Sequence, residues 1–186
     1  MRKIIYRMSV SVDGFMEAAN GDIGWSAPNP ELHQHFNDLE SAVDAFLYGR
    51  RLYENMAAYW PTADQNPAAP KQEKEYARIW RNKPKIVFST TLHRVEWNSR
   101  LVKGDIAQEV RKLKVQPGNE LTVGGAGLAA SFMQLGLIDE YWLYVHPVTL
   151  GGGKPMFGPL QNQIDLQLLD TRRFGQGVIL LRYQAG

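Results

Sequence analysis

The sequence of 186 residues contains no cysteine, and this absence excludes several kinds of chemistry. A disulfide framework, a thiolate zinc site and a cysteine nucleophile all need side chains that the chain lacks. Long apolar runs are also missing. The basic start, Met1 to Arg7, is not a signal peptide, and no stretch reaches the roughly 20 apolar residues of a membrane span. We therefore expect a cytoplasmic protein without membrane contact.

Charge of one sign is not concentrated anywhere in the chain. The formal net charge is +2, and basic and acidic residues are interspersed. Proteins that bind nucleic acid usually carry a basic stripe or block, so the charge pattern favours a small-molecule partner over nucleic acid. Apolar residues make up 44% and charged residues 22%, which is typical of a globular protein. The length predicts a single domain over residues 1–186.

Apolar runs and turn residues predict alternating strands and helices. Asn29-Pro30-Glu31 has the cap, proline and acid of a helix start, while Asp13-Gly14 ends the first strand. We expect loops over 17–27 and 61–70, and an α/β fold with a mostly parallel sheet and an antiparallel C-terminal hairpin. The predicted strands are 4–12, 42–48, 85–89, 101–102, 120–123 and 141–150, the helices begin near 30, 50, 71, 106 and 128, and the hairpin joins 164–169 to 178–183.

Two strand–glycine–helix junctions carry most of the functional signal. The first is Phe46 to Arg51, with Gly49 before two arginines, and the second is Val123 to Leu128, with Gly124, Gly125 and Gly127. Glycine lets the backbone approach a ligand, and the helix that follows offers free N–H groups to an anion. In open α/β sheets both junctions lie at the carboxyl ends of the strands, where ligands bind. Either junction alone is more often a simple turn, but together they predict a dinucleotide site.

Two familiar phosphate motifs do not apply. Gly125 to Ala130 matches the Rossmann glycine pattern, but Asp139 and Glu140 come too early, at the start of the next strand rather than its end. Gly151 to Pro155 lacks the leading glycine and the Ser or Thr of a P-loop.

These residues carry a resemblance to a known family. The chain resembles the dihydrofolate reductase superfamily, and specifically the reductase domain at the C-terminus of the bifunctional riboflavin-biosynthesis deaminase-reductase. The resemblance implies a three-layer fold and covers essentially the whole chain, with 59–83 supported least. The matching segments are Ser11 to Phe15, Gly49 to Arg51, Phe88 to Thr90, and Val123 to Phe157 with its Leu150-Gly151-Gly152-Gly153-Lys154-Pro155 motif.

The resemblance implies NADPH as cofactor. Where dihydrofolate reductases place a threonine soon after the arginine, this chain has Leu52, so one phosphate contact is lost. The implied pyrophosphate residues are Gly124, Gly125, Ala126 and Gly127, and those at the adenosine end and its 2′-phosphate are Gly49, Arg50, Arg51, Ser89 and Thr90.

Two carboxylates are candidates for the catalytic acid. Asp13 matches the Asp-Gly of the riboflavin reductases, and Glu31 lies near the helix position of the dihydrofolate reductase carboxylate if one loop residue is inserted. A carboxylate can hydrogen-bond or protonate a heterocycle that accepts hydride. Each also has a structural explanation, because Asp13 suits a turn and Glu31 suits the first turn of a helix. We rank Asp13 first.

Aromatic and histidine residues give weaker evidence about function. Trp25 lies where the superfamily has a mobile loop over the nicotinamide, although an isolated tryptophan usually packs. His33 and His35 point to different sides of one helix, so no metal site is predicted. The strand from Tyr141 to Leu150 is apolar or aromatic on both faces and, with the closing hairpin, predicts a homodimer like those of the related reductase domains.

The sequence thus predicts an NADPH-dependent reductase of a small heterocycle, resembling 5-amino-6-(5-phosphoribosylamino)uracil reductase of riboflavin biosynthesis. The deaminase half is absent, since its zinc motifs are missing. A dihydrofolate reductase-like enzyme acting on a pterin or another substrate, and a non-catalytic nucleotide-binding relative, remain alternatives.

Overall fold

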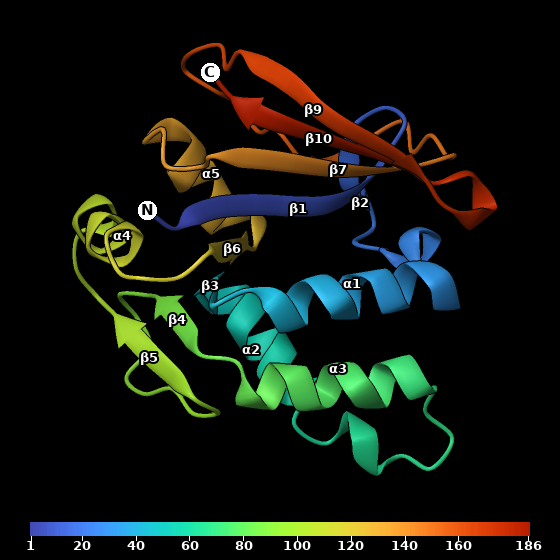
Figure 1. Cartoon of the computed structure of the whole chain (residues 1–186). Helices are drawn as coiled ribbons and strands as arrows, with labels where there is room; N and C mark the ends of the chain where they lie inside the picture. The colour runs from blue at the N-terminus through green and yellow to red at the C-terminus, as the bar shows by residue number, and fades with distance from the viewer.

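The chain folds around one eight-stranded sheet, described here from a computed structural model that covers residues 1–186 (Figure 1). The strand order is β5-β4-β3-β6-β1-β7-β10-β9, and the first six strands in this order are parallel. β10 runs antiparallel to both β7 and β9, which confirms the predicted mixed sheet with a C-terminal hairpin. The strands are β1 (Lys3–Ser11), β3 (Ala45–Gly49), β4 (Lys85–Phe88), β5 (Ser99–Val102), β6 (Glu120–Gly124), β7 (Glu140–His146), β9 (Leu166–Arg173) and β10 (Ile179–Ala185).

Five α-helices cover the two faces of this sheet and make the predicted three layers. Buried residues of α4 and α5 pack on the face formed by Ile4, Tyr6 and Val123. The opposite face, which carries Ile5 and Phe46, is covered by α1, α2 and α3, and α1 and α3 lie side by side (Figure 1). The helices are α1 (Pro30–Ala42), α2 (Arg50–Tyr59), α3 (Lys71–Asn82), α4 (Ile106–Lys114) and α5 (Ala126–Gln134).

Helix starts follow the local sequence closely. The Asn29 side chain accepts a hydrogen bond from the Leu32 amide at 2.8 Å, and Pro30 is the first helical residue, as predicted. α2 begins directly after Gly49. α5 begins at Ala126, two residues earlier than predicted, because Gly125 with φ +89° turns the chain straight from strand into helix.

A second, two-stranded sheet was not predicted. β2 (Phe15–Ala18) pairs antiparallel with β8 (Gly153–Pro155) beyond the end of β1. The sequence predicted a loop from residue 17 and a continuous strand over 141–150, but β7 ends at His146, because Pro147 has no N–H for a ladder. We call β2 and β8 the flap.

The segment expected to be a loose loop, 61–70, is tied to α3. A short 3-10 turn spans Ala63–Gln65, and the Asp64 carboxylate accepts two hydrogen bonds at 2.7 Å from the Arg81 guanidinium. This bidentate pair lowers the pKa of Asp64. None of the helices is long and apolar enough to cross a membrane.

Candidate active site

A large cleft of about 1250 Å³ opens where the parallel strands end. All nine residues predicted to bind the cofactor line it. The parallel sheet explains this convergence, because the junctions after β3, β4 and β6 are brought to one edge. Their role in binding a cofactor stays a prediction.

The first junction places Gly49 before the free N–H groups of α2. A Cβ on Gly49 would lie 3.4 Å from the Cβ of Leu128 at the start of α5, so the two junctions pack against each other. The Arg50 side chain is about half exposed and forms an ion pair with Glu54 at 3.3 Å. This pair lies on one helix face at i, i+4 spacing, which leaves the guanidinium close to the cleft that Arg50 lines.

The second junction requires glycine for steric reasons. A Cβ on Gly124 would lie 2.6 Å from Cδ2 of Leu52 and 3.2 Å from the Tyr48 ring, and Gly125 has φ +89°. Leu52, which stands where the resemblance expects a threonine, therefore packs directly against these glycines. Nothing lies within 4 Å of a Cβ on Gly127, so open space borders the first turn of α5.

Polar residues after β4 and β5 extend the cleft beyond α2. Ser89 Oγ accepts hydrogen bonds from the amides of Thr91 and Leu92 at 3.2 and 3.1 Å, which fixes the turn that carries Thr90. Lys103 also lines the cleft and adds a cation that the sequence analysis did not single out. Its position directly after a predicted strand was the available signal.

The structure places Asp13 against the glycine-rich segment before β8 and not among the cleft-lining residues. Its carboxylate accepts hydrogen bonds from the amides of Gly151 at 2.7 Å and Leu150 at 3.1 Å. The Ser11 hydroxyl, together with these amides, lowers the pKa of Asp13 to about 2. Asp13 therefore holds the glycine-rich segment before β8 in place.

Glu31 also lies away from the cleft. One of its carboxylate oxygens accepts a hydrogen bond from the Gly175 amide at 3.0 Å, which joins the start of α1 to the short turn Gly175–Gly177 before β10. The structure thus brings neither predicted carboxylate to the cofactor residues. Their catalytic role stays a prediction.

Trp25 packs edge-on against His146 with 5.6 Å between the ring centroids, and it does not line the cleft. His146 in turn lies 3.2 Å from the Ser9 hydroxyl, and burial lowers the pKa of its imidazole. No group of three or more acidic or histidine side chains is arranged to hold a metal ion.

The flap closes one end of the cleft. Lys154 of β8 and Glu17 of β2 form an ion pair at 3.2 Å, and both line the cleft. Met16 and Met156, also on this side, are buried and give the wall an apolar surface. The sequence analysis did not single out these four residues as part of the site, because it did not predict the strands β2 and β8.

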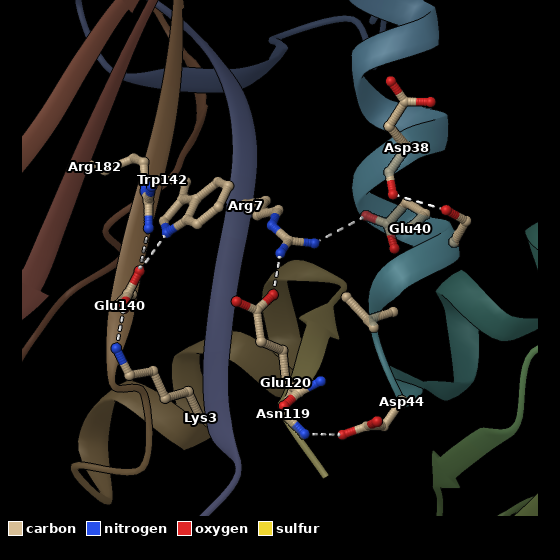
Figure 2. A network of polar contacts seen from close by, with 12 residues as sticks. Lys3, Arg7, Asp38, Glu40, Asp44, Asn119, Glu120, Glu140, Trp142 and Arg182 are labelled. Carbon is tan, nitrogen blue, oxygen red and sulfur yellow. Dashed lines mark hydrogen bonds and ion pairs between the residues drawn. The ribbon is translucent and has the colours of Figure 1, made fainter.

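Charged side chains from within β1 and α1 also line the cleft, which the sequence analysis did not predict. Arg7 of β1 points toward α1 (Figure 2), where its guanidinium lies 2.8 Å from Glu120 and 3.6 Å from Glu40. Burial raises the pKa of Glu40, and the charge of Arg7 opposes this shift. Arg7 and Glu40 line the cleft together with Thr122, Tyr48 and Tyr76.

A second network lies on the neighbouring strand β7 and touches Arg7 through Trp142. Glu140 is buried and accepts hydrogen bonds from Lys3, Trp142 and Arg182 (Figure 2). Arg7 and Arg182 both stack on the Trp142 ring, at 4.5 and 4.0 Å from its centre. Arg182 and Glu140 do not line the cleft, so this network is structural.

Comparison with known proteins fits this arrangement. The model of the RibD C-terminal domain matches residues 2–180. The chain belongs to this family. It is 37% identical over 183 residues, 98% of this chain and 94% of the relative, to the uncharacterized protein YyaP of Bacillus subtilis (strain 168).

Solved structures agree with the family. A protein assigned to riboflavin biosynthesis from Shewanella sp. PV-4 superposes with a TM-score of 0.78 at 25% identity, and 99% of each chain is covered. Dihydrofolate reductase from Enterococcus faecalis, solved with NADP(H) and RAB-propyl, has a TM-score of 0.64 at 10% identity, with 99% of this chain and 96% of that chain covered. The chain shares the fold of both solved structures.

Proposed function

We propose that this member of the RibD C-terminal domain family is an NADPH-dependent reductase of a small heterocyclic substrate, similar to the uracil reductase of riboflavin biosynthesis. The observation that carries the proposal is the meeting of two strand–glycine–helix junctions in one cleft beside Arg50. The reductase family and the NADP(H) complex of the Enterococcus dihydrofolate reductase support the choice of cofactor.

The cleft residues fit a dinucleotide phosphate. Gly125, with φ +89°, turns the chain from β6 into α5, so the free N–H groups of the first turn of α5 border the cleft, and open space borders Gly127. Arg50, Ser89 and Thr90 supply a cation and two hydroxyls, which are the groups that a 2′-phosphate needs. Bound NADPH supplies a hydride to the substrate ring.

The chain's own residues would orient the two ligands and exclude water. The backbone at Gly124 to Gly127 would hold the pyrophosphate, and Arg50 would hold the 2′-phosphate. The buried Met16 and Met156 of the flap region keep one wall of the cleft apolar, which favours hydride transfer over side reactions with water.

Two measurements on the purified chain test this function. NADPH binding is followed by calorimetry, and NADPH oxidation is followed by absorbance with 5-amino-6-(5-phosphoribosylamino)uracil and with dihydrofolate. We expect binding together with oxidation dependent on the pyrimidine. Binding without oxidation by either substrate would favour a non-catalytic nucleotide-binding protein, and no binding at all would refute the proposal.

A further inference from the structure

The inner end of the cleft forms a chamber between the sheet and the helices α1, α2 and α3. We define the chamber by residues that line the cleft on this face, none of them among the predicted cofactor residues. The whole cleft, at about 1250 Å³, exceeds the roughly 300–1,000 Å³ of a typical ligand site, so it has room for a second ligand beside a cofactor. The chamber residues are Arg7, Glu40, Tyr48, Leu52, Met56, Tyr76 and Thr122.

Arg7 is nearly buried but incompletely paired. Its side chain is 7% exposed, and its only hydrogen bond is from Nη2 to Glu120 at 2.8 Å. Nε and Nη1 are buried and have no hydrogen-bond partner. Buried N–H groups are almost always paired in folded proteins, so unpaired ones on a cleft-lining arginine point to a missing acceptor.

Glu40 supplies the complementary group. Its Oε1 lies 3.6 Å from Nη1 of Arg7, too far for a hydrogen bond, and its carboxylate accepts no hydrogen bond from any other residue. A donor and an acceptor therefore stand side by side at the inner end of the cleft, and Figure 2 shows Arg7 and Glu40 facing each other across the space between β1 and α1.

The other chamber residues suit a flat ring. Leu52 and Met56 of α2 and the buried Tyr48 offer apolar surface to the faces of a ring. Thr122 and Tyr76 add hydroxyls, which can donate or accept at further ring substituents. A phosphate or carboxylate ligand would bring a negative charge close to Glu40 and Glu120, so the set disfavours an anionic group at this end.

We propose that Arg7 and Glu40 determine substrate specificity by reading the lactam edge of a planar heterocycle. The ring carbonyl accepts from Arg7, and the adjacent ring N–H donates to Glu40. This inference deepens the proposed reductase function, on which it rests for taking the ligand to be the substrate, but binding to the chamber can be tested without turnover.

The probes are 1-methyluracil, which keeps one ring N–H between two carbonyls, and 1,3-dimethyluracil, which keeps the carbonyls but has no N–H. Each is titrated into the ¹⁵N-labelled full chain, with the Arg7 Nε–H signal and backbone amides as readout. We expect 1-methyluracil to shift the Arg7 signal and 1,3-dimethyluracil to bind about tenfold more weakly or worse.

Variants separate recognition from a purely structural role. Arg7→Met removes the donor to the ring carbonyl, which both probes keep, so it should weaken both probes about tenfold or more. Glu40→Gln, which keeps shape and packing, should weaken binding of 1-methyluracil several-fold and bring the two probes closer in affinity. The matched control is Arg182→Met, which removes an arginine that stacks on the same Trp142 ring but does not line the cleft; it should bind both probes like the wild type.

No shift of the Arg7 signal with 1-methyluracil up to its solubility limit would overturn the inference. Equal affinity of the folded Glu40→Gln and wild-type proteins for both probes would also overturn it. NADPH binding is measured on the same samples. Binding of 1-methyluracil without binding of NADPH would support recognition by Arg7 and Glu40 and refute the proposed cofactor. Binding of NADPH without binding of 1-methyluracil would support the cofactor and refute the recognition.

Discussion

At the scale of single residues, Arg50 is the clearest test of cofactor choice. It borders the cleft beside Ser89 and Thr90, and its one fixed partner is Glu54 on the same helix. A charge-assisted hydrogen bond to a 2′-phosphate is worth roughly 1.5–3 kcal/mol. Arg50→Ala should therefore weaken NADPH binding by about tenfold or more and leave NADH binding nearly unchanged, as measured by calorimetry.

Glu54→Gln is the control for this prediction, because it removes the competing carboxylate and keeps the arginine. It should leave NADPH binding unchanged or make it tighter. If Arg50→Ala weakens NADH and NADPH to the same extent, Arg50 does not contact the 2′-phosphate.

Lys85 predicts a distinctive pH dependence of stability. It is 1% exposed at the start of β4, and its Nζ donates to the carbonyls of Trp80 and Lys83 at 2.6 and 2.7 Å. Burial lowers the pKa of Lys85 from 10.5 to about 8. Between these two pH values the unfolded chain binds more protons than the folded one, so the free energy of unfolding rises with pH.

We expect the wild type to gain roughly 3 kcal/mol relative to Lys85→Met as the pH rises through this window, and no relative change below about pH 8. Urea unfolding followed by circular dichroism at a series of pH values measures the difference. The same comparison with Lys112→Met, an exposed residue of α4, controls for general effects of pH. If the difference in free energy of unfolding between the wild type and Lys85→Met does not change with pH, the two carbonyls and the Trp80 ring offset the cost of burying the charge.

At the scale of elements, prediction worked where the signal is local. The cap at Asn29 and the glycines at 49 and 125 depend on neighbouring residues only, so α1, α2 and the two junctions could be placed from the sequence. The flap could not, because β2 and β8 are three or four residues long and pair across more than 130 positions. Such short strands form only when the rest of the fold brings them together.

The flap depends on Gly153 more than on the other glycines of its motif. A Cβ at Gly153 would lie 2.0 Å from the Glu17 carbonyl oxygen of β2, and Gly153 has φ +134°. Gly153→Ala must therefore push the two strands apart. We expect it to lower the melting temperature by several degrees and to increase amide hydrogen exchange in residues 15–18, since a distorted backbone typically costs about 1–3 kcal/mol.

Gly152→Ala is the matched control, because no atom lies within 4 Å of its Cβ and its φ is not positive. It should leave both the melting temperature and the exchange rates at their wild-type values. Equal and small effects of the two substitutions would mean that β2 and β8 do not pack as closely as described.

At the scale of the whole molecule, the general rule for parallel sheets located the cleft. The predicted cofactor residues line it because strand ends converge, whatever the side chains are. The rule says nothing about residues inside strands and helices, where apolar side chains are the usual expectation. Arg7 and Glu40 were missed for this reason. Asp13 and Glu31 accept hydrogen bonds from backbone amides that lie 137 and 144 positions away in the chain, which no sequence pattern reveals.

The C-terminal hairpin exposes apolar surface of the kind that binds a second chain. β9 is the edge strand of the sheet and is exposed along nearly its whole length, with no helix over it (Figure 1). Leu168 is 51% and Ile179 44% exposed, and the β9–β10 register places both on one face with Leu181 and Tyr183. An exposed apolar edge of this kind normally pairs with another chain or aggregates.

We therefore propose a symmetric homodimer through the β9–β10 face. Sedimentation at micromolar concentration should give a species of twice 21.1 kDa. Ile179→Arg places a charge on this face and should shift the protein to monomer, because a charge buried without a partner costs several kcal/mol. Leu135→Arg, at an equally exposed leucine after α5, should leave the dimer intact. A 21.1 kDa wild-type species would refute the dimer, and the exposed edge would then have to be kept soluble by the charges of Asp170, Arg172 and Arg173 along β9.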